Sequence, residues 1–231
     1  MKTILITGAN RGLGLEFARQ FLARGDKVIA CCRAPNEAVE LQALNNDGLE
    51  ILPLDVSNEE AIQSLPGRLS GILKESKIAI FINNAGIYGQ TQSLDEVDPE
   101  EWLQVLRINT IAPLLLTRAL LPLMDRQLPG KLMFLSSKMG SIADNGGGST
   151  YIYRTSKTAL NQVVKSLSID LAAQGLLTAA LHPGWVRTDM GGPNGLIDAN
   201  ESVAGMMRVI DALDATTSGH FFNFDGAEIP W

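Results

Sequence analysis

The stretch Thr3–Gly14, which reads TILITGANRGLG, decides the fold of this chain. Its first five residues are apolar or β-branched and lead into a glycine turn, a pattern typical of a buried strand. A helical apolar pattern follows over residues 12–24 and stops at Gly25. Glycines between a strand and a helix allow a sharp turn and a close approach to a pyrophosphate, which the helix N-terminus attracts. The stretch therefore predicts the start of a dinucleotide-binding fold, although its Gly-x-x-x-Gly-x-Gly spacing departs from Gly-x-Gly-x-x-Gly.

Strand-like and helix-like segments alternate along the rest of the chain. We predict strands at residues 3–7, 27–31, 49–54, 78–82, 131–135, 176–182 and 220–224. We predict helices at residues 12–24, 37–44, 58–74, 99–109, 113–126, 151–173 and 199–213, with an interruption at Pro66 and a kink near Pro122. Such alternation predicts an α/β fold: a Rossmann-like, doubly wound parallel sheet of about seven strands with helices on both faces. No linker divides the chain, so we expect a single domain over residues 1–231.

Composition and charge narrow the class of protein. The chain has 231 residues, 45% of them hydrophobic, and its formal net charge of -6 argues against nucleic-acid binding. It contains no run of 18 apolar residues, so we expect no membrane span. Its cysteines, Cys31 and Cys32, are sequence neighbours that rarely bridge each other, and reduced thiols are consistent with a cytoplasmic protein. We expect no bound metal.

Tyr153 and Lys157 form the most suggestive pair of polar side chains. They stand four residues apart at the start of a predicted helix, which places the phenol and the ammonium on one face. A lysine charge beside a phenol favours the phenolate and is expected to lower the tyrosine pKa from about 10. Such a pair can donate or accept a proton, but the spacing alone is common in helices.

Three features together resemble one known family. The glycine loop, the stretch Asn83–Gly86 and the Tyr153–Lys157 pair are similar to motifs of the short-chain dehydrogenase/reductase family, in its compact single-domain form. Within that family, the stretches Tyr153–Lys157, Gly184–Gly192 and Gly226–Trp231 resemble the sniffer-type carbonyl reductase and C-signal branch. The resemblance spans the chain and implies a nicotinamide-dependent oxidoreductase.

The resemblance implies a catalytic set of side chains: Asn109, Ser137, Tyr153 and Lys157. In this set the Ser137 hydroxyl would hydrogen-bond a substrate carbonyl, and Tyr153 would donate the proton to the forming alkoxide. Lys157 would bind the nicotinamide ribose, and Asn109 would hold a water that links the lysine to solvent.

Some of these assignments leave alternatives open. Ser136 and, more remotely, Ser141 compete with Ser137 for the role of catalytic serine. Asn109 could instead only disrupt its helix. Asp55, which the resemblance places against the adenine, could instead be a plain turn or capping acid.

The resemblance also implies a set of cofactor-binding positions near the ends of the strands. They are Gly8, Asn10, Arg11, Gly12, Leu13, Gly14, Arg33, Asp55, Val56, Asn83, Ala85, Gly86, Tyr153, Lys157, Pro183, Gly184, Val186 and Thr188. The last four belong to a segment that would cover the nicotinamide.

Charge at the end of the second strand indicates which cofactor is preferred. NAD-dependent relatives carry an acid there to bind the ribose 2′-hydroxyl, whereas this chain has the neutral Cys32 followed by Arg33. Arg11 adds a second cation in the glycine loop. Because guanidinium groups match a 2′-phosphate and an acid would repel it, we expect NADP(H).

These expectations combine into a functional hypothesis. The chain is expected to be an NADPH-dependent carbonyl reductase that acts on a small aldehyde or ketone. The alternative is an NADP(H)-binding redox sensor or signalling protein with incidental turnover. A short glycine-rich lid near residues 189–200 indicates an open substrate pocket. The resemblance implies a homodimer or homotetramer in which the helices at 113–126 and 151–173 form the subunit contact. The apolar residues on more than one side of the helix at 113–126 agree with this expectation.

Overall fold

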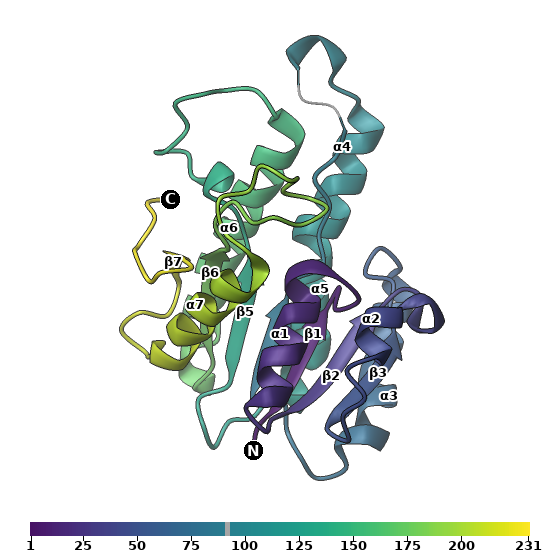
Figure 1. Ribbon diagram of the computed structural model, residues 1–231. Helices are drawn as coiled ribbons and strands as arrows, with labels where there is room; N and C mark the ends of the chain where they lie inside the picture. The colour runs from purple at the N-terminus through teal and green to yellow at the C-terminus, as the bar shows by residue number, and fades with distance from the viewer. Residues whose placement is uncertain (91–92) are drawn as a thin grey trace.

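The computed structural model describes residues 1–90 and 93–231, and within them seven parallel strands form one sheet (Figure 1). The strands run in the order β3-β2-β1-β4-β5-β6-β7. Their bounds are β1 Thr3–Thr7, β2 Lys27–Cys32, β3 Leu49–Pro53, β4 Ile80–Asn83, β5 Lys131–Leu135, β6 Leu177–His182 and β7 His220–Asn223. The order reverses direction between β1 and β4, and ligands of such sheets bind in the crevice beyond the strand ends at this point. The predicted Rossmann-like fold is confirmed.

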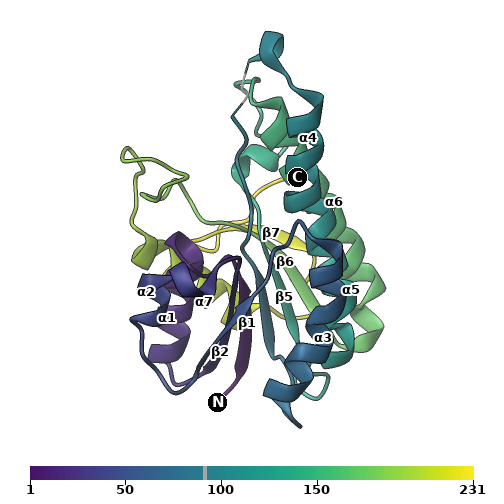
Figure 2. The same ribbon diagram turned by 90° about the vertical axis from the view of Figure 1, so that its right-hand side faces the viewer.

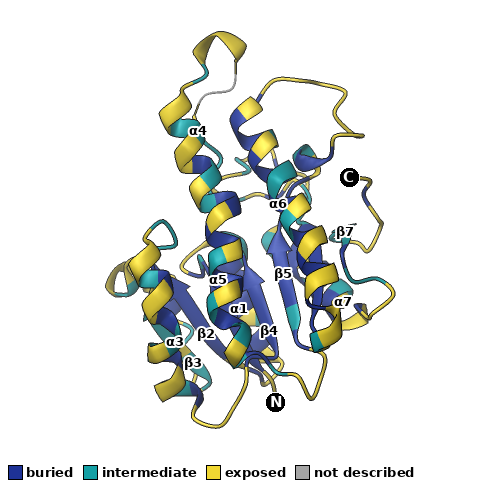
Figure 3. Ribbon diagram, turned by 180° about the vertical axis from the view of Figure 1, so that it is seen from behind, coloured by how far each residue is buried: buried dark blue, intermediate teal, exposed yellow. Residues whose placement is uncertain are grey.

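Helices cover both faces of the sheet. Their bounds are α1 Gly12–Ala23, α2 Val39–Gln42, α3 Glu59–Leu73, α4 Pro99–Leu106, α5 Ala112–Leu120, α6 Tyr151–Asp170 and α7 Ala199–Ala212. Figure 2 shows α1, α2 and α7 on one side of the sheet and α3, α5 and α6 on the other. Each side has its own apolar layer, with Phe17 and Phe21 fully buried in the first and Leu65 and Leu116 in the second. The inner strands, such as β2, β4 and β5, are buried on both faces (Figure 3), as parallel strands between helices must be, whereas the edge strands β3 and β7 are only partly buried.

Two helix predictions were wrong in ways that packing explains. The segment predicted as a helix at 37–44 is a 3₁₀ turn, Pro35–Glu37, followed by the four-residue helix α2. In α2 only Leu41 is buried, so little apolar contact supports a longer helix. By contrast, Pro66 does not interrupt α3, which runs unbroken over Glu59–Leu73. The buried face of α3 carries a leucine or isoleucine on every turn, and this packing offsets the proline cost of about 3 kcal/mol.

The region predicted as two separate helices is one continuous helical stretch. A π turn at Arg107–Ile111 joins α4 to α5, and a 3₁₀ turn at Leu121–Leu123 ends it beside Pro122. Pro113 cannot donate the backbone hydrogen bond that an α-helix needs. The wider turn just before it lets Ala112 N–H reach the carbonyl of Arg107.

This stretch, Pro99–Leu123, is also apolar along much of its length. It has 25 residues, and an 18-residue window within it has a mean hydropathy of 1.2. Among the helices of the described residues, it is the one that is long and apolar enough to cross a membrane. A core helix passes the same test, and 39% of that window is buried in the fold. Part of the stretch, α5, packs against α3. The absence of a membrane span stays a prediction.

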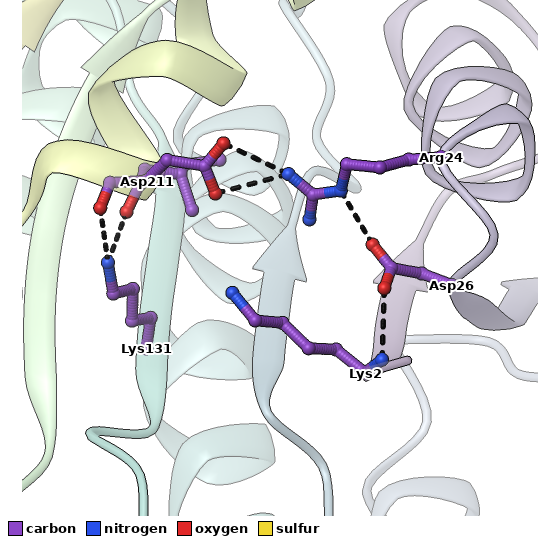
Figure 4. Close-up of polar contacts among 6 residues, drawn as sticks. Lys2, Arg24, Asp26, Lys131 and Asp211 are labelled. Carbon is purple, nitrogen blue, oxygen red and sulfur yellow. Dashed lines mark hydrogen bonds and ion pairs between the residues drawn. The ribbon is translucent and has the colours of Figure 1, made fainter.

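A polar network joins four chain segments at the amino ends of the strands (Figure 4). Asp26 accepts hydrogen bonds from the backbone N–H of Lys2 at 2.9 Å and from Arg24 Nε at 2.7 Å. Arg24 also donates to both carboxylate oxygens of Asp211, at 3.0 and 3.1 Å. Lys131 Nζ donates to the Asp211 carbonyl at 3.1 Å, at the end of α7. The network therefore ties the ends of α1 and α7 to β1 and β5.

We predict that Asp26→Asn destabilises the fold. The Asp26 side chain is only 8% exposed, and the substitution removes a charge that Arg24 pairs with in a partly buried place. Hydrogen bonds to buried charged groups contribute about 1–3 kcal/mol, which corresponds to a fall in Tm of roughly 2–12 °C for a chain of this size. Differential scanning calorimetry measures it. The exposed acid Asp47 gives the control, because Asp47→Asn should stay within about 0.5 kcal/mol of the parent. Equal effects of the two substitutions would contradict the assigned role of the network.

Candidate active site

The glycine loop between β1 and α1 is built so that only glycine fits. Gly8 and Gly12 have φ of +65° and +54°, a region that favours glycine. A Cβ on Gly14 would lie 2.2 Å from the carbonyl oxygen of Gly8 and 2.6 Å from Asn84 Nδ2. The loop therefore leaves its backbone open for a phosphate group at the N-terminus of α1. The other predicted contacts here and near β3 lie at the same edge: Asn10 is exposed, and Leu13 and Val56 are partly buried.

Asn84 joins the glycine loop to the loop after β4. Its Nδ2 donates to the carbonyls of Thr7 and Gly8, at 2.9 and 3.0 Å. In return, the Thr7 hydroxyl accepts from the backbone N–H groups of Asn84 and Ala85, both at 3.1 Å. The sequence motif Asn83–Gly86 pointed to this stretch, but our cofactor list left out Asn84 and Thr7, which hold the two loops together.

The adjacent Asn83, at the end of β4, presents an unpaired donor. The residue is 4% exposed, and its Nδ2 has no hydrogen-bond partner among the described residues. A buried amide without a partner costs free energy, so this atom is suited to a polar group of a bound ligand. The glycine loop and the Asn83 side chain together make the crevice between β1 and β4 suitable for a dinucleotide.

The end of β2 has the charge pattern that we predicted. The strand ends at the buried Cys32, and the next residue, Arg33, is exposed. Asp55 lies close enough for Arg33 to help lower the carboxyl pKa, although the larger cause is a hydrogen bond from Ser57. Asp55 Oδ1 accepts from the Ser57 N–H at 2.9 Å and from its hydroxyl at 2.7 Å. Asp55 thus forms a turn, and its contact with an adenine stays a prediction.

Arg11, the other predicted cation, is already paired. Its Nη1 lies 2.8 Å from Oδ2 of Asp189, and both side chains are largely exposed. Thr188 also lies beside the glycine loop, 3.7 Å from where a Cβ on Gly12 would stand. The loop after β6 therefore reaches across to the loop after β1.

The segment that follows β6 is held by its own hydrogen bonds. Val186 and Ile197 form an isolated parallel bridge, and Trp185 Nε1 donates to the Gly191 carbonyl at 2.7 Å. Upstream, the Pro183 carbonyl accepts from the Ser202 hydroxyl at 2.6 Å, and Gly184 has a φ of +83°. Helix α7 begins at 199, so the last two residues of the predicted lid at 189–200 belong to that helix. The substrate-covering role of the rest stays a prediction.

Tyr153 and Lys157 lie together at the start of α6, as predicted. They are 7% and 6% exposed, and Lys157 Nζ is 5.7 Å from the centre of the Tyr153 ring. The Lys157 ammonium donates to the carbonyl of Leu135, at the end of β5, at 2.8 Å. A Cβ on Gly86 would stand 3.6 Å from the same Nζ, so the lysine also lies beside the loop after β4.

Burial dominates the proton affinities of this pair. Desolvation raises the pKa of the Tyr153 phenol, and a hydrogen bond with the Ser137 hydroxyl opposes the rise in part. The expectation that Lys157 would lower the pKa of Tyr153 below its ordinary value was therefore wrong in direction. Desolvation also lowers the pKa of Lys157, to about 8. The raised pKa keeps the proton on the Tyr153 phenol near neutral pH, which is the form that a proton donor needs.

The three candidate serines have separate partners. Ser137 caps the 3₁₀ turn Lys138–Gly140, accepts from the Met139 N–H at 3.2 Å and lies close enough to the Tyr153 phenol to lower its pKa. Ser136 instead donates to Asn161 Oδ1 at 2.6 Å. Of the two neighbours, Ser137 is the one that meets the phenol.

The third serine, Ser141, is held by the end of the chain. Its hydroxyl donates to the Pro230 carbonyl at 2.6 Å, and the Ala143 N–H donates to the Trp231 carbonyl at 3.1 Å. The Trp231 ring in turn stacks on Phe221 of β7, with 5.7 Å between ring centres. Residues 227–231 therefore form a C-terminal strap along the loop that follows Ser137.

Asn109 lies in the π turn and clamps the loop after β4. Its Oδ1 accepts from the Ile87 N–H at 2.9 Å, and its Nδ2 donates to the Ile87 carbonyl at 2.8 Å. Nδ2 also donates to the hydroxyl of Ser156, on α6, at 3.0 Å. Asn109 is 1% exposed, so it joins three segments of the site in its interior. π turns are frequent at functional sites, and here the turn aims this side chain.

Sequence reasoning missed Tyr88, whose ring packs on Tyr153. The two ring centres are 4.4 Å apart and the planes are tilted by 33°. Tyr88 follows the Asn83–Gly86 motif, but no periodicity or spacing marks it as part of the site. Its proximity arises only when the loop after β4 folds over the start of α6.

The arrangement as a whole is suited to proton transfer beside a dinucleotide. The site brings together the Tyr153 phenol, the Ser137 hydroxyl and the buried Lys157 ammonium where β5 and α6 meet. The lysine lies beside the loop after β4, which Asn84 joins to the glycine loop. Within residues 1–90 and 93–231, no group of three or more His, Cys, Asp or Glu side chains could hold a metal ion.

Comparison with known proteins agrees with this arrangement. The family model described as short chain dehydrogenase matches residues 2–196. C-signal of Myxococcus xanthus is 45% identical over 154 residues, which cover 67% of this chain and 93% of C-signal. The structure of the carbonyl reductase Sniffer of D. melanogaster has a TM-score of 0.96 and 36% identity, with 100% of both chains covered. The NADPH-bound carbonyl reductase from chicken fatty liver has a TM-score of 0.95 and 37% identity, with 100% of this chain and 99% of that chain covered. The chain therefore belongs to the short-chain dehydrogenase family of oxidoreductases.

Proposed function

We propose that the chain is an NADPH-dependent carbonyl reductase that acts on small aldehydes or ketones. The observation that carries the proposal is the cluster of Ser137, Tyr153 and Lys157, in which a protonated phenol meets a serine hydroxyl beside a buried ammonium. Similarity to an NADPH-bound carbonyl reductase supports it.

The residues of the site divide the work of the reaction. The Ser137 hydroxyl donates a hydrogen bond to the substrate carbonyl oxygen, and Tyr153 gives its proton to that oxygen as negative charge develops there. The Lys157 ammonium stabilises the phenolate that remains. When bound, NADPH would supply the hydride that the carbonyl carbon receives. Asn109 holds the loop after β4 against α6 and so keeps these groups in one geometry.

Other residues of the crevice would hold the cofactor. The backbone of the glycine loop fits the pyrophosphate, and the unpaired Asn83 Nδ2 offers a donor to a polar group of the cofactor. Lys157 would bind the nicotinamide ribose, Asp55 the adenine, and the segment 183–188 would cover the nicotinamide. Arg33 and Arg11 would meet the 2′-phosphate, which makes NADPH preferred over NADH.

A turnover screen tests the proposed function. NADPH oxidation is followed at 340 nm with a panel of small aldehydes, ketones and quinones, and we expect saturable turnover with at least one of them. Binding of NADPH is measured in parallel by quenching of tryptophan fluorescence. Tight NADPH binding with no turnover across the panel would sink the reductase proposal and favour the redox-sensing alternative.

We predict that Arg33→Ala weakens the preference for NADPH. Loss of a charge-assisted contact with the 2′-phosphate should raise KM for NADPH by about 10-fold to 100-fold. KM for NADH should change little, because NADH lacks that phosphate. Steady-state kinetics with both cofactors measures the effect. Arg208→Ala, which removes an exposed arginine of α7, is the matched control and should alter neither value. An equal rise in KM for both cofactors would contradict the assignment.

We propose that the chain forms a homodimer or homotetramer through α4, α5 and α6. Leu103, Ile111 and Leu114 are 61%, 50% and 42% exposed along the α4–α5 stretch, and water is a poor partner for such a row. Light scattering should give two or four times the chain mass of 24.9 kDa. The double substitution Ile111→Glu and Leu114→Glu should lower that mass to one chain. A monomeric mass for the parent protein would refute the proposal.

A cytoplasmic location is proposed on a narrower basis. Cys31 and Cys32 are both free and buried, and reduced thiols persist in the cytoplasm. Recovery of the chain in a secreted or membrane fraction after cell fractionation would contradict it.

A further inference from the structure

Tyr88 is the closest described aromatic neighbour of the proposed proton donor. Its ring centre is 4.4 Å from that of Tyr153, a typical distance for a packed aromatic pair. Lys157 Nζ, 5.7 Å from the same Tyr153 ring centre, is a second contact of that ring. The Tyr153 ring therefore lies between Tyr88 and Lys157.

Tyr88 is itself held on two sides. Its backbone neighbour Ile87 is clamped through both its N–H and its carbonyl by Asn109, at 2.9 and 2.8 Å. Its hydroxyl lies 3.7 Å from Met139 Sδ, in the 3₁₀ turn that Ser137 caps. The ring thus spans from the Asn109 clamp to the turn that carries the proposed catalytic serine.

We propose that Tyr88 is a positioning residue for Tyr153. The ring packs on the phenol, keeps its hydroxyl directed to Ser137 and keeps water away from it. The expected kinetic effect rests on the proposed function. The contact between the two rings does not depend on that function. The presence of Tyr88 also helps to raise the pKa of Tyr153, beyond the larger effect of burial.

Kinetics of Tyr88→Leu and Tyr88→Phe test the role. A small misplacement of a catalytic group can lower the rate by about 100-fold, so Tyr88→Leu should lower kcat by about 10-fold to 100-fold. KM for NADPH should stay within about twofold, because the ring acts on the phenol. Tyr88→Phe keeps the ring and should stay within about threefold of the parent kcat. The matched control is Tyr151→Phe, which removes the hydroxyl of a 37% exposed tyrosine on α6, the helix of Tyr153. It should change neither kcat nor KM.

The substrate comparison distinguishes positioning from direct contact. Benzaldehyde and hexanal should lose kcat equally in Tyr88→Leu, since the ring acts through Tyr153. A loss confined to benzaldehyde would show that Tyr88 contacts the substrate and would overturn the positioning role. Parent-like kcat in a Tyr88→Leu protein with an unchanged Tm would overturn it as well.

An absorbance titration tests the ring contact without any turnover. The chain has three tyrosines, so the difference between the parent and Tyr153→Phe isolates the phenolate signal of Tyr153. The same difference is taken in the Tyr88→Leu background. Because burial raises the Tyr153 pKa in the parent, its phenolate signal should be absent over the pH range in which the fold is intact, and we expect the signal to appear at lower pH in the Tyr88→Leu background, where water reaches the phenol. An unchanged pKa would overturn the proposal, whereas a lack of turnover in the parent would count only against the reductase function.

Discussion

Tyr153→Phe is expected to lower kcat by about 10²-fold to 10⁴-fold, the usual contribution of a positioned general acid. The substitution removes only the hydroxyl, so the ring still packs on Tyr88 and beside Lys157. The loss is therefore one of proton donation, since the shape of the site is kept. It is measured as the rate of NADPH oxidation with the best substrate of the screen.

The matched measurements decide what such a loss means. The dissociation constant for NADPH, measured by tryptophan fluorescence, should change little, because Tyr153→Phe leaves the glycine loop and Asn83 unchanged. Tyr151→Phe should keep parental turnover, because Tyr151 begins the same helix but is partly exposed. Substantial turnover in Tyr153→Phe would rule out this residue as the proton donor.

Gly14→Ala is expected to have a large effect of a different kind. Its Cβ would stand 2.2 Å from the Gly8 carbonyl oxygen and 2.6 Å from Asn84 Nδ2, and neither backbone nor tied amide can move cheaply. Overpacking of this kind costs about 1–3 kcal/mol, and the displaced loop should bind NADPH at least about tenfold more weakly. Calorimetry and fluorescence titration measure the two effects.

Gly67→Ala is the control for the same chemical change elsewhere. Gly67 lies on the exposed side of α3, where an added Cβ meets nothing within 4 Å. Alanine favours a helix over glycine by about 0.5–1 kcal/mol, so this variant should be slightly more stable than the parent and bind NADPH equally. If Gly14→Ala were as harmless as Gly67→Ala, the close packing of the glycine loop would be wrong.

The inner strands could be predicted well because each is a short apolar run, and burial on both faces leaves little alternative. Helix lengths were harder, since they depend on what each helix packs against. The sequence of α3 shows Pro66 but not the sheet surface that keeps the helix intact. The π turn at Arg107–Ile111 likewise depends on Pro113 and on the loop that Asn109 clamps, and no local pattern announces it.

The site was predictable where short motifs carry the contacts. Tyr153 and Lys157 are neighbours through helical spacing alone, and the glycine loop is continuous in sequence. Tyr88 and Asp189 could not be assigned to the site from the sequence, because each contacts a residue that is distant along the chain. Tyr88 packs on Tyr153, and Asp189 pairs with Arg11. The direction of the Tyr153 pKa was missed for a similar reason: helical spacing shows the nearby lysine but not the extent of burial.

The C-terminal strap affects how the protein can be handled. Any residues added after Trp231, such as an affinity tag or a fused reporter, would begin beside the loop that follows Ser137. The N-terminus lies at the other end of the sheet, near the start of β1 (Figure 1). Purification and labelling are therefore best arranged at the N-terminus, so that turnover measurements report on an undisturbed site. For the same reason, a fluorophore attached after Trp231 would report movements of that loop.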